Sequence, residues 1–123
     1  MEALYQRHCE PCKMGSKVVT ATEVNQLLIG VPAWRKEFHE GVEKLIRDFY
    51  FIEFKDAFEF TYKIANLAER EKHHPGIYTE WGKVTVYWWS HKINGLHVND
   101  FIMAAKTDMI AKLSRNARQG TSL

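Results

Sequence analysis

The chain has 123 residues, of which 46% are hydrophobic and 26% charged, and its formal net charge is +2. This size and composition suit one compact domain, and so small a charge gives no reason to expect nucleic acid or an anionic membrane as a partner. No apolar run approaches the ~20 residues that cross a bilayer, and the first residues do not have the pattern of a secretory signal. We therefore expect one cytoplasmic domain over residues 1–123, with an irregular arm at 1–19 and a frayed tail at 114–123.

The first part of the chain predicts a short helix and two strands. Thr20 and Glu23 have the spacing of a capping box, so a helix should begin there and end near Gly30. Residues 34–38 and 45–52 are rich in aromatic and β-branched side chains that alternate along the chain, which favours two strands.

A long amphipathic helix should follow the second strand. Apolar and small residues recur there at spacings of three and four, which describes one stripe over about four helical turns: Phe54, Ala57, Phe58, Thr61, Ile64, Ala65 and Ala68. The sequence His73-His74-Pro75-Gly76 should end this helix. Proline disfavours helical geometry in the residue before it, and glycine frees the backbone.

The last part of the chain predicts two more strands and a final helix. Residues 77–81 and 84–89 should be strands joined by a turn at Gly82, and Asn94-Gly95 marks a turn before a helix that runs from about Phe101 to Leu113. The order is therefore helix, strand, strand, helix, strand, strand, helix. Neighbouring strands with short turns favour an α+β fold, with a four-stranded antiparallel sheet and three helices packed on one face.

Three histidines lie where reactive groups are common. His73 and His74 are at the join of a helix and a strand, and His91 follows the strongest predicted strand. An imidazole both gives and takes protons near neutral pH. From their spacing alone, His73 and His74 are more readily interpreted as surface loop residues, and His91 as a turn residue, than as a catalytic group. Trp88 and Trp89 face opposite sides of their strand, so one should be core and the other a pocket wall or an interface.

Two further features have competing interpretations. Asp100 either contacts a substrate or stabilises the N-terminus of the last helix. Cys9-x-x-Cys12 has the spacing of two zinc ligands, but adjacent His73 and His74 point in different directions on an extended backbone and do not complete the set. A thioredoxin-like motif should open a helix, which is not expected here. We therefore predict no metal site and two reduced thiols in the arm.

Three short motifs follow one another at characteristic distances: Glu69-x-x-x-His73-His74-Pro75, Ser90-His91, and Gly95-Leu96-x-x-x-Asp100. Their order resembles the pterin-4a-carbinolamine dehydratase family, and the likeness extends over roughly residues 20–113. The resemblance implies the element order given above, no metal or organic cofactor, and assembly into homodimers or homotetramers. It also implies that His73, His74 and His91 are catalytic and that Glu69 and Asp100 bind the pterin substrate.

The implied reaction is the dehydration of 4a-hydroxytetrahydropterin to quinonoid dihydropterin, which recycles the cofactor of aromatic amino acid hydroxylases. We expect His73 and His91 to act as the acid–base pair, in an order that the sequence does not decide, and His74 to hold the pterin. One alternative is a non-catalytic role as a dimerisation partner of a transcription factor, through a helix surface. Another is a pterin-binding relative in molybdopterin metabolism.

The sequence departs from the family pattern at a few positions. Ser90 stands where threonine is usual, and His97 stands where threonine normally caps the last helix, although histidine is a poorer cap. Lys72 replaces a common Asp or Asn, and Gly76-Ile77 does not supply the aromatic residue that some members have after the proline. We expect the last two changes to affect the rim of the pocket rather than the type of reaction.

Overall fold

The computed structural model describes residues 3–10 and 16–114. Its helices and strands follow one another in the predicted order: helix α1 (Ala21–Leu28), strands β1 (Arg35–His39) and β2 (Val42–Tyr50), helix α2 (Phe54–Glu71), strands β3 (Gly76–Glu80) and β4 (Lys83–Trp88), and helix α3 (Val98–Lys112). In the arm, where irregular structure is predicted, the described residues contain one 3-10 turn, η1 (Leu4–Gln6). Cys12 and the predicted frayed tail beyond Ser114 lie outside the described residues.

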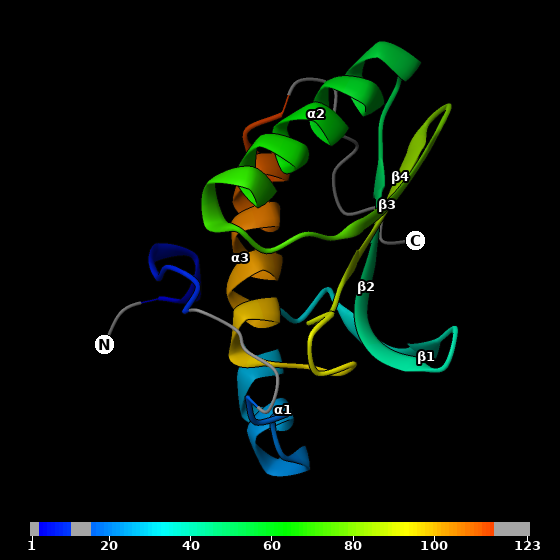
Figure 1. Ribbon diagram of the computed structural model, residues 1–123. Coiled ribbons are helices and arrows are strands. Elements are labelled where there is room, and N and C mark those ends of the chain that lie inside the picture. Colours follow the sequence, from blue (N-terminus) through cyan, green and yellow to red (C-terminus); the bar gives the residue numbers. More distant parts are fainter. Residues whose placement is uncertain (1–2, 11–15, 115–123) are drawn as a thin grey trace.

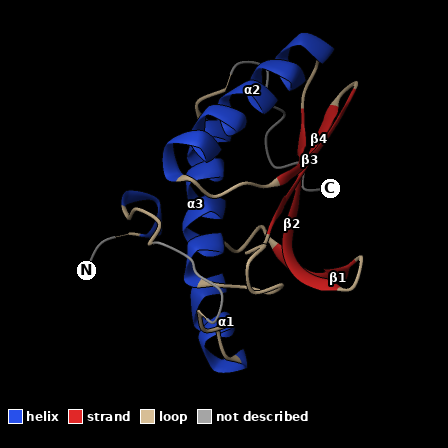
Figure 2. Ribbon diagram, viewed as in Figure 1, coloured by secondary structure: helices blue, strands red, loops and turns tan. Residues whose placement is uncertain are grey.

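The strands form one antiparallel sheet in the order β1-β2-β4-β3, so the predicted α+β fold is confirmed. Helices α2 and α3 lie on the same side of this sheet, and α1 lies at one end of α3 (Figures 1 and 2). Strand β2 begins at Val42, three residues before its predicted start. The reason is a tight turn at Glu40 and Gly41, both with positive φ, which pairs His39 directly with Val42.

Aromatic rings fill the core between the sheet and the helices. Phe49 of β2 packs against Trp34 and against Phe60 of α2, with ring centroids 5.9 and 4.9 Å apart. Phe51 extends the cluster, with its ring 5.2 Å from that of Phe60. Each of these four residues has at most 5% of its surface exposed, and burying one such side chain contributes about 1.5–3 kcal/mol. This cluster fixes α2 against β2.

The buried face of α2 differs from the predicted stripe. Ala57, Ile64 and Ala68 are buried as predicted, but Phe54, Phe58 and Ala65 are exposed; the additional buried apolar residues are Phe60 and Leu67. The helix carries apolar residues on two sides, and the side at spacings of three and seven from Ala57 is the one that meets the sheet. The other side leaves Phe54, Phe58 and Tyr62 exposed one turn apart.

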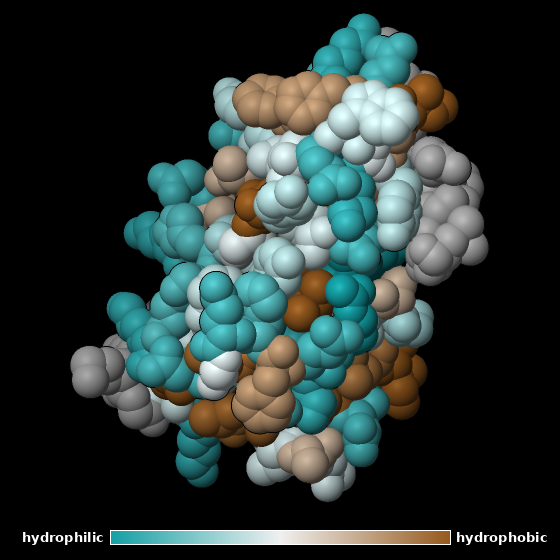
Figure 3. Space-filling view, turned by 90° about the vertical axis from the view of Figure 1, so that its right-hand side faces the viewer, coloured by the Kyte–Doolittle hydropathy of each residue, from teal (hydrophilic) through white to brown (hydrophobic). Residues whose placement is uncertain are grey.

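The opposite face of the sheet is not covered by these helices. Seen from that side, apolar atoms form separate patches among polar ones (Figure 3). None of the described helices is long and apolar enough to cross a membrane.

Lys72 ends α2 in a left-handed conformation, with φ 55° and ψ 40°. This backbone costs a residue with a Cβ about 1–2 kcal/mol, and Asn and Asp tolerate it best among such residues. A family preference for Asp or Asn at this position therefore has a physical reason. The turn at Lys72 lets the His73 backbone N–H reach the Ala68 carbonyl at 3.2 Å and directs the chain back along the helix.

We predict that Lys72→Asn raises the free energy of unfolding by about 0.5–1 kcal/mol, because it relieves this left-handed strain. The measurement is urea denaturation followed by circular dichroism. Lys63→Asn is the matched control, since Lys63 is exposed within α2 and asparagine should lower stability there by about 0.5 kcal/mol. Equal effects of the two substitutions would contradict the assignment of strain to Lys72.

Candidate active site

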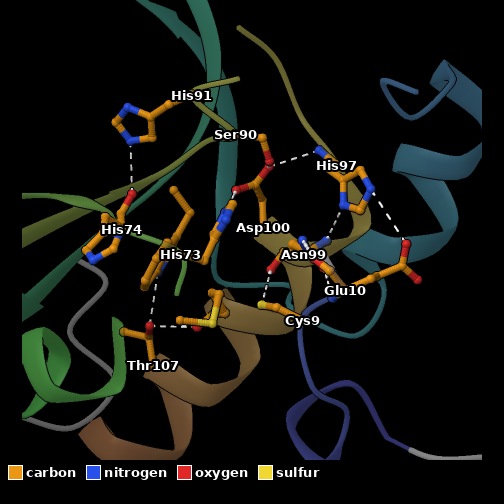
Figure 4. Close-up of polar contacts among 12 residues, drawn as sticks. Cys9, Glu10, His73, His74, Ser90, His91, His97, Asn99, Asp100 and Thr107 are labelled. Carbon is orange, nitrogen blue, oxygen red and sulfur yellow. Dashed lines mark hydrogen bonds and ion pairs between the residues drawn. The ribbon is translucent and has the colours of Figure 1, made fainter. Parts of the chain in front are cut away.

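The predicted site residues meet where three elements come together: the end of α2, the end of β4 and the first turn of α3 (Figure 4). The residue at the centre is Asp100, which is fully buried. Its Oδ1 accepts from Nε2 of His73 at 2.6 Å, and its Oδ2 accepts from the Ser90 hydroxyl and from the His97 backbone N–H, both at 2.9 Å. A buried carboxylate is costly unless it is well hydrogen-bonded, and these three donors meet that need.

His73 is buried, with 7% of its surface exposed, and therefore differs from a surface loop residue. Its ring stacks on Trp88 with centroids 5.8 Å apart and planes 12° apart. Because a carboxylate can only accept, the proton in the contact with Asp100 belongs to Nε2 of His73. The opposite nitrogen, Nδ1, is not used in this contact.

His74 and His91 are exposed and lie beside each other. Nε2 of His74 is 2.6 Å from Oε2 of Glu69, and Nε2 of His91 is 3.0 Å from the backbone carbonyl of His74. Both partners are acceptors, so both Nε2 atoms donate. All three histidines are therefore oriented through Nε2 and keep Nδ1 for other contacts.

The structure brings together all five residues that the sequence singles out. His73 and Asp100 form the buried part, whereas Glu69, His74 and His91 form the exposed part. The position of Asp100 supports the interpretation that it stabilises the N-terminus of the last helix, because its carboxylate accepts from the backbone of the N-cap residue of α3. The substrate-binding roles of Glu69 and Asp100 and the catalytic roles of the histidines stay predictions.

The departures at Ser90 and His97 keep the network intact. Ser90 supplies the hydroxyl donor expected of threonine. Nδ1 of His97 accepts from the Asn99 backbone N–H at 3.1 Å, so this histidine caps α3, which begins at Val98. Asp100 completes the capping box, so the helix begins three residues before its predicted start near Phe101.

The support that Ser90 gives to Asp100 is a contact that the motif alone does not predict. Strand alternation contains a signal for it, because Ser90 continues the inward series of Val84, Val86 and Trp88, which are all fully buried. A polar residue at such a position needs a buried partner, and Asp100 is that partner.

The N-terminal arm packs behind this network. The side-chain amide of Asn99 accepts from the Glu10 backbone N–H at 2.9 Å and donates to the Glu10 carbonyl at 2.8 Å. The Cys9 backbone N–H donates to Glu71 at 2.9 Å, and Lys106 donates to the Tyr5 carbonyl at 3.0 Å. Figure 4 shows Cys9, Glu10 and Asn99 on the side of Asp100 away from His74. The sequence gives no signal for this docking, since the arm takes part in these four hydrogen bonds through its backbone groups.

Burial and neighbouring charges shift the pKa of Cys9 in the arm and of Glu71, which binds the arm. Desolvation by burial, with the charges of Glu71 and Asp100, raises the pKa of the Cys9 thiol to about 12. Burial alone would raise the pKa of Glu71, but hydrogen bonds from the Cys9 backbone and from His8, with Lys106 nearby, lower it overall. A thiol so hard to ionise is a poor metal ligand. Within residues 3–10 and 16–114, no group of three or more His, Cys, Asp or Glu side chains is arranged to hold a metal ion.

Comparison with known proteins adds to this geometry. Residues 17–110 match the family model described as pterin 4 alpha carbinolamine dehydratase. The crystal structure of a transcriptional coactivator/pterin dehydratase from Brucella melitensis is similar over 76% of this chain and 98% of its own, with 33% identity and a TM-score of 0.69. A pterin dehydratase-like protein identified as a RuBisCO assembly factor in the alpha-carboxysome matches over 63% of this chain and 88% of its own, at 22% identity and a TM-score of 0.54, which shows a shared fold alone.

We predict that Cys9 reacts slowly with iodoacetamide. At pH 8 a thiol with a pKa of about 12 is ionised in roughly one molecule in ten thousand, and the thiolate is the reactive form. The measurement is the alkylation rate of Cys9 by peptide mapping in a Cys12→Ser background. Glu71→Gln should accelerate it, because this change removes a negative charge and weakens the hold on the arm, whereas Glu59→Gln on the exposed side of α2 should not. Rapid alkylation of the folded parent would contradict the docked arm.

Proposed function

This chain belongs to the pterin-4a-carbinolamine dehydratase family, and we propose that it dehydrates 4a-hydroxytetrahydropterin to quinonoid dihydropterin. The observation that carries the proposal is the buried contact of 2.6 Å between His73 and Asp100, beside two exposed histidines that share the same orientation. The proposed role is to recycle the pterin cofactor of aromatic amino acid hydroxylases, in the cytoplasm. It needs no metal or organic cofactor.

The reaction requires an acid and a base at one ring edge. The bond from N5 to hydrogen and the bond from C4a to oxygen break, and a C4a–N5 double bond forms from the electrons released at N5. A base takes the N5 proton, and an acid protonates the hydroxyl so that it leaves as water. Proton exchange between base and acid, through solvent, then restores both groups.

We assign the base to His73 and the acid to His91. The imidazolium that forms when His73 takes a proton is stabilised by the carboxylate of Asp100, which is held in place by Ser90 and His97. His91 donates through Nε2 to the His74 carbonyl, so Nδ1 is the nitrogen from which the proposed acid gives its proton. His74, oriented by Glu69, binds the pterin.

A binding role is the second candidate. The exposed aromatic stripe of Phe54, Phe58 and Tyr62 on α2 favours it, because such stripes commonly mark helix–helix contacts. The Brucella protein is described both as a coactivator and as a dehydratase, so the two roles need not exclude each other. A relative that acts on another pterin, for example in molybdopterin metabolism, would retain the histidines and differ in its substrate.

We predict that His91→Ala lowers kcat by about 10²–10⁴-fold, the usual contribution of a general acid or base, while the exposed position keeps the protein folded. His73→Gln should cause a similar loss. His73→Ala is less suitable, because it removes one of the three donors of a fully buried carboxylate, at a cost of about 1–3 kcal/mol or more. The double variant should lose less than the product of the single losses.

The measurement is steady-state kinetics with the 4a-hydroxypterin after exhaustive chelation, with circular dichroism to confirm folding. His74→Ala should raise KM more than it lowers kcat. Near-normal turnover in His91→Ala or His73→Gln would contradict the catalytic assignment and favour the binding role.

We also predict that the protein is a homodimer or homotetramer at micromolar concentration, since an exposed aromatic stripe is costly in a monomer. The measurement is light scattering during size-exclusion chromatography. Phe58→Lys should shift the protein toward a smaller assembly, whereas Phe38→Lys, on an exposed side chain of β1, should not. A parent of about 14 kDa at all concentrations would argue against self-association.

A further inference from the structure

The imidazole of His91 is held largely by a neighbouring indole. His91 lies in the exposed turn after β4, and its ring centroid is 4.2 Å from that of Trp89, with 31° between the planes. The hydrogen bond from Nε2 to the His74 carbonyl fixes one edge of the ring, and the indole fixes its plane. The orientation of Trp89 therefore decides where Nδ1 of His91 points.

The indole of Trp89 is held in turn by a buried cation. Nζ of Lys44 lies 3.9 Å from the Trp89 ring centroid and 3.0 Å from Nδ1 of His39, and Lys44 is only 3% exposed. Leu45 of β2 pairs with Trp88 of β4, so Lys44 and Trp89, which directly follows β4, are the next residues along these two antiparallel segments. An ammonium removed from water binds an aromatic face more strongly than an exposed one does. The cation–π contact with Lys44 therefore holds the indole of Trp89 in one orientation.

Gly76 provides the space for this indole. A Cβ built on Gly76 would lie 3.3 Å from Cζ3 and 3.6 Å from Cη2 of Trp89. The indole thus extends from β4 over the start of β3, which is the strand that follows His74 and its carbonyl. The glycine after Pro75, a departure from the family pattern, has a structural use at this place.

We propose that Lys44 and Trp89 are positioning residues for His91. The buried ammonium fixes the indole, and the indole fixes the imidazole so that Nε2 donates to the His74 carbonyl and Nδ1 is free for proton transfer. The effect on turnover rests on the proposed function, but the effect on the ring of His91 does not. Neither residue needs to touch the substrate.

The kinetic test uses Trp89→Leu and Lys44→Met. Misplacing a proton-transfer group by about an ångström can cost up to ~10²-fold, so Trp89→Leu should lower kcat by about 10- to 100-fold at unchanged KM. Lys44→Met should lower it by about 3- to 10-fold, the range of one partly desolvated cation–π contact. Trp89→Phe should restore most of the loss. Trp81→Leu and Lys83→Met, near the β3–β4 turn, are the matched controls and should retain parental turnover.

A double-mutant comparison separates positioning from general damage. In a His91→Ala background, Trp89→Leu and Lys44→Met should cause no further loss, because the group that they position is absent. Full additional losses in that background, or parental turnover of Trp89→Leu with His91 present, would overturn the proposal.

The second readout is independent of activity. The indole ring current should displace the NMR resonances of the carbon-bound ring protons of His91, and Trp89→Leu should return them to ordinary values, with a smaller change in Lys44→Met. Unchanged resonances in Trp89→Leu would also overturn the proposal. A parental protein that does not turn over the pterin would contradict the proposed function alone, since these resonances still decide whether Trp89 and Lys44 set the ring of His91.

Discussion

The buried carboxylate of Asp100 is the constraint on which the site depends. It accepts from His73 just after α2, from Ser90 just after β4 and from the N-cap residue of α3, so one charged group joins three elements of the fold. None of the three contacts can be lost cheaply, because a buried carboxylate that loses a donor costs about 1–3 kcal/mol or more. The stability of the fold and the orientation of His73 thus have the same origin.

The order of helices and strands, and the grouping of the histidines in one site, could be predicted from the sequence. Period-two alternation and the turn residues specify β2 and β4, and the motif order places the histidines at strand and helix ends. The buried side of α2 was harder to predict because this helix has two apolar sides, and only the sheet decides between Phe58 and Phe60. The docking of the arm could not be predicted, since Asn99 and Glu71 bind backbone groups that carry no sequence signal.

The three histidines are not equivalent in rigidity. His73 is enclosed by Asp100 and Trp88, so its geometry is set before any substrate arrives. His74 and Glu69 are both more than half exposed, and a surface pair of this kind contributes little stability and moves easily. In the proposed reaction, His73 is the proton acceptor that is oriented before the substrate binds, and the more mobile His74 adjusts as the pterin ring enters.

The residues at the end of β4 explain how the exposed ring of His91 is kept in one orientation. Successive strand residues face opposite sides, so Trp88 points toward the helices and stacks on His73, whereas Trp89 points to the open face and packs on His91. The same alternation sends Ser90 inward to Asp100 and leaves His91 outside. Two adjacent tryptophans therefore serve two histidines on opposite sides of one strand. A single-residue shift in the pairing of β4 would exchange these sides and separate both rings from their supports, so the register of the sheet is itself a condition for the geometry of the site.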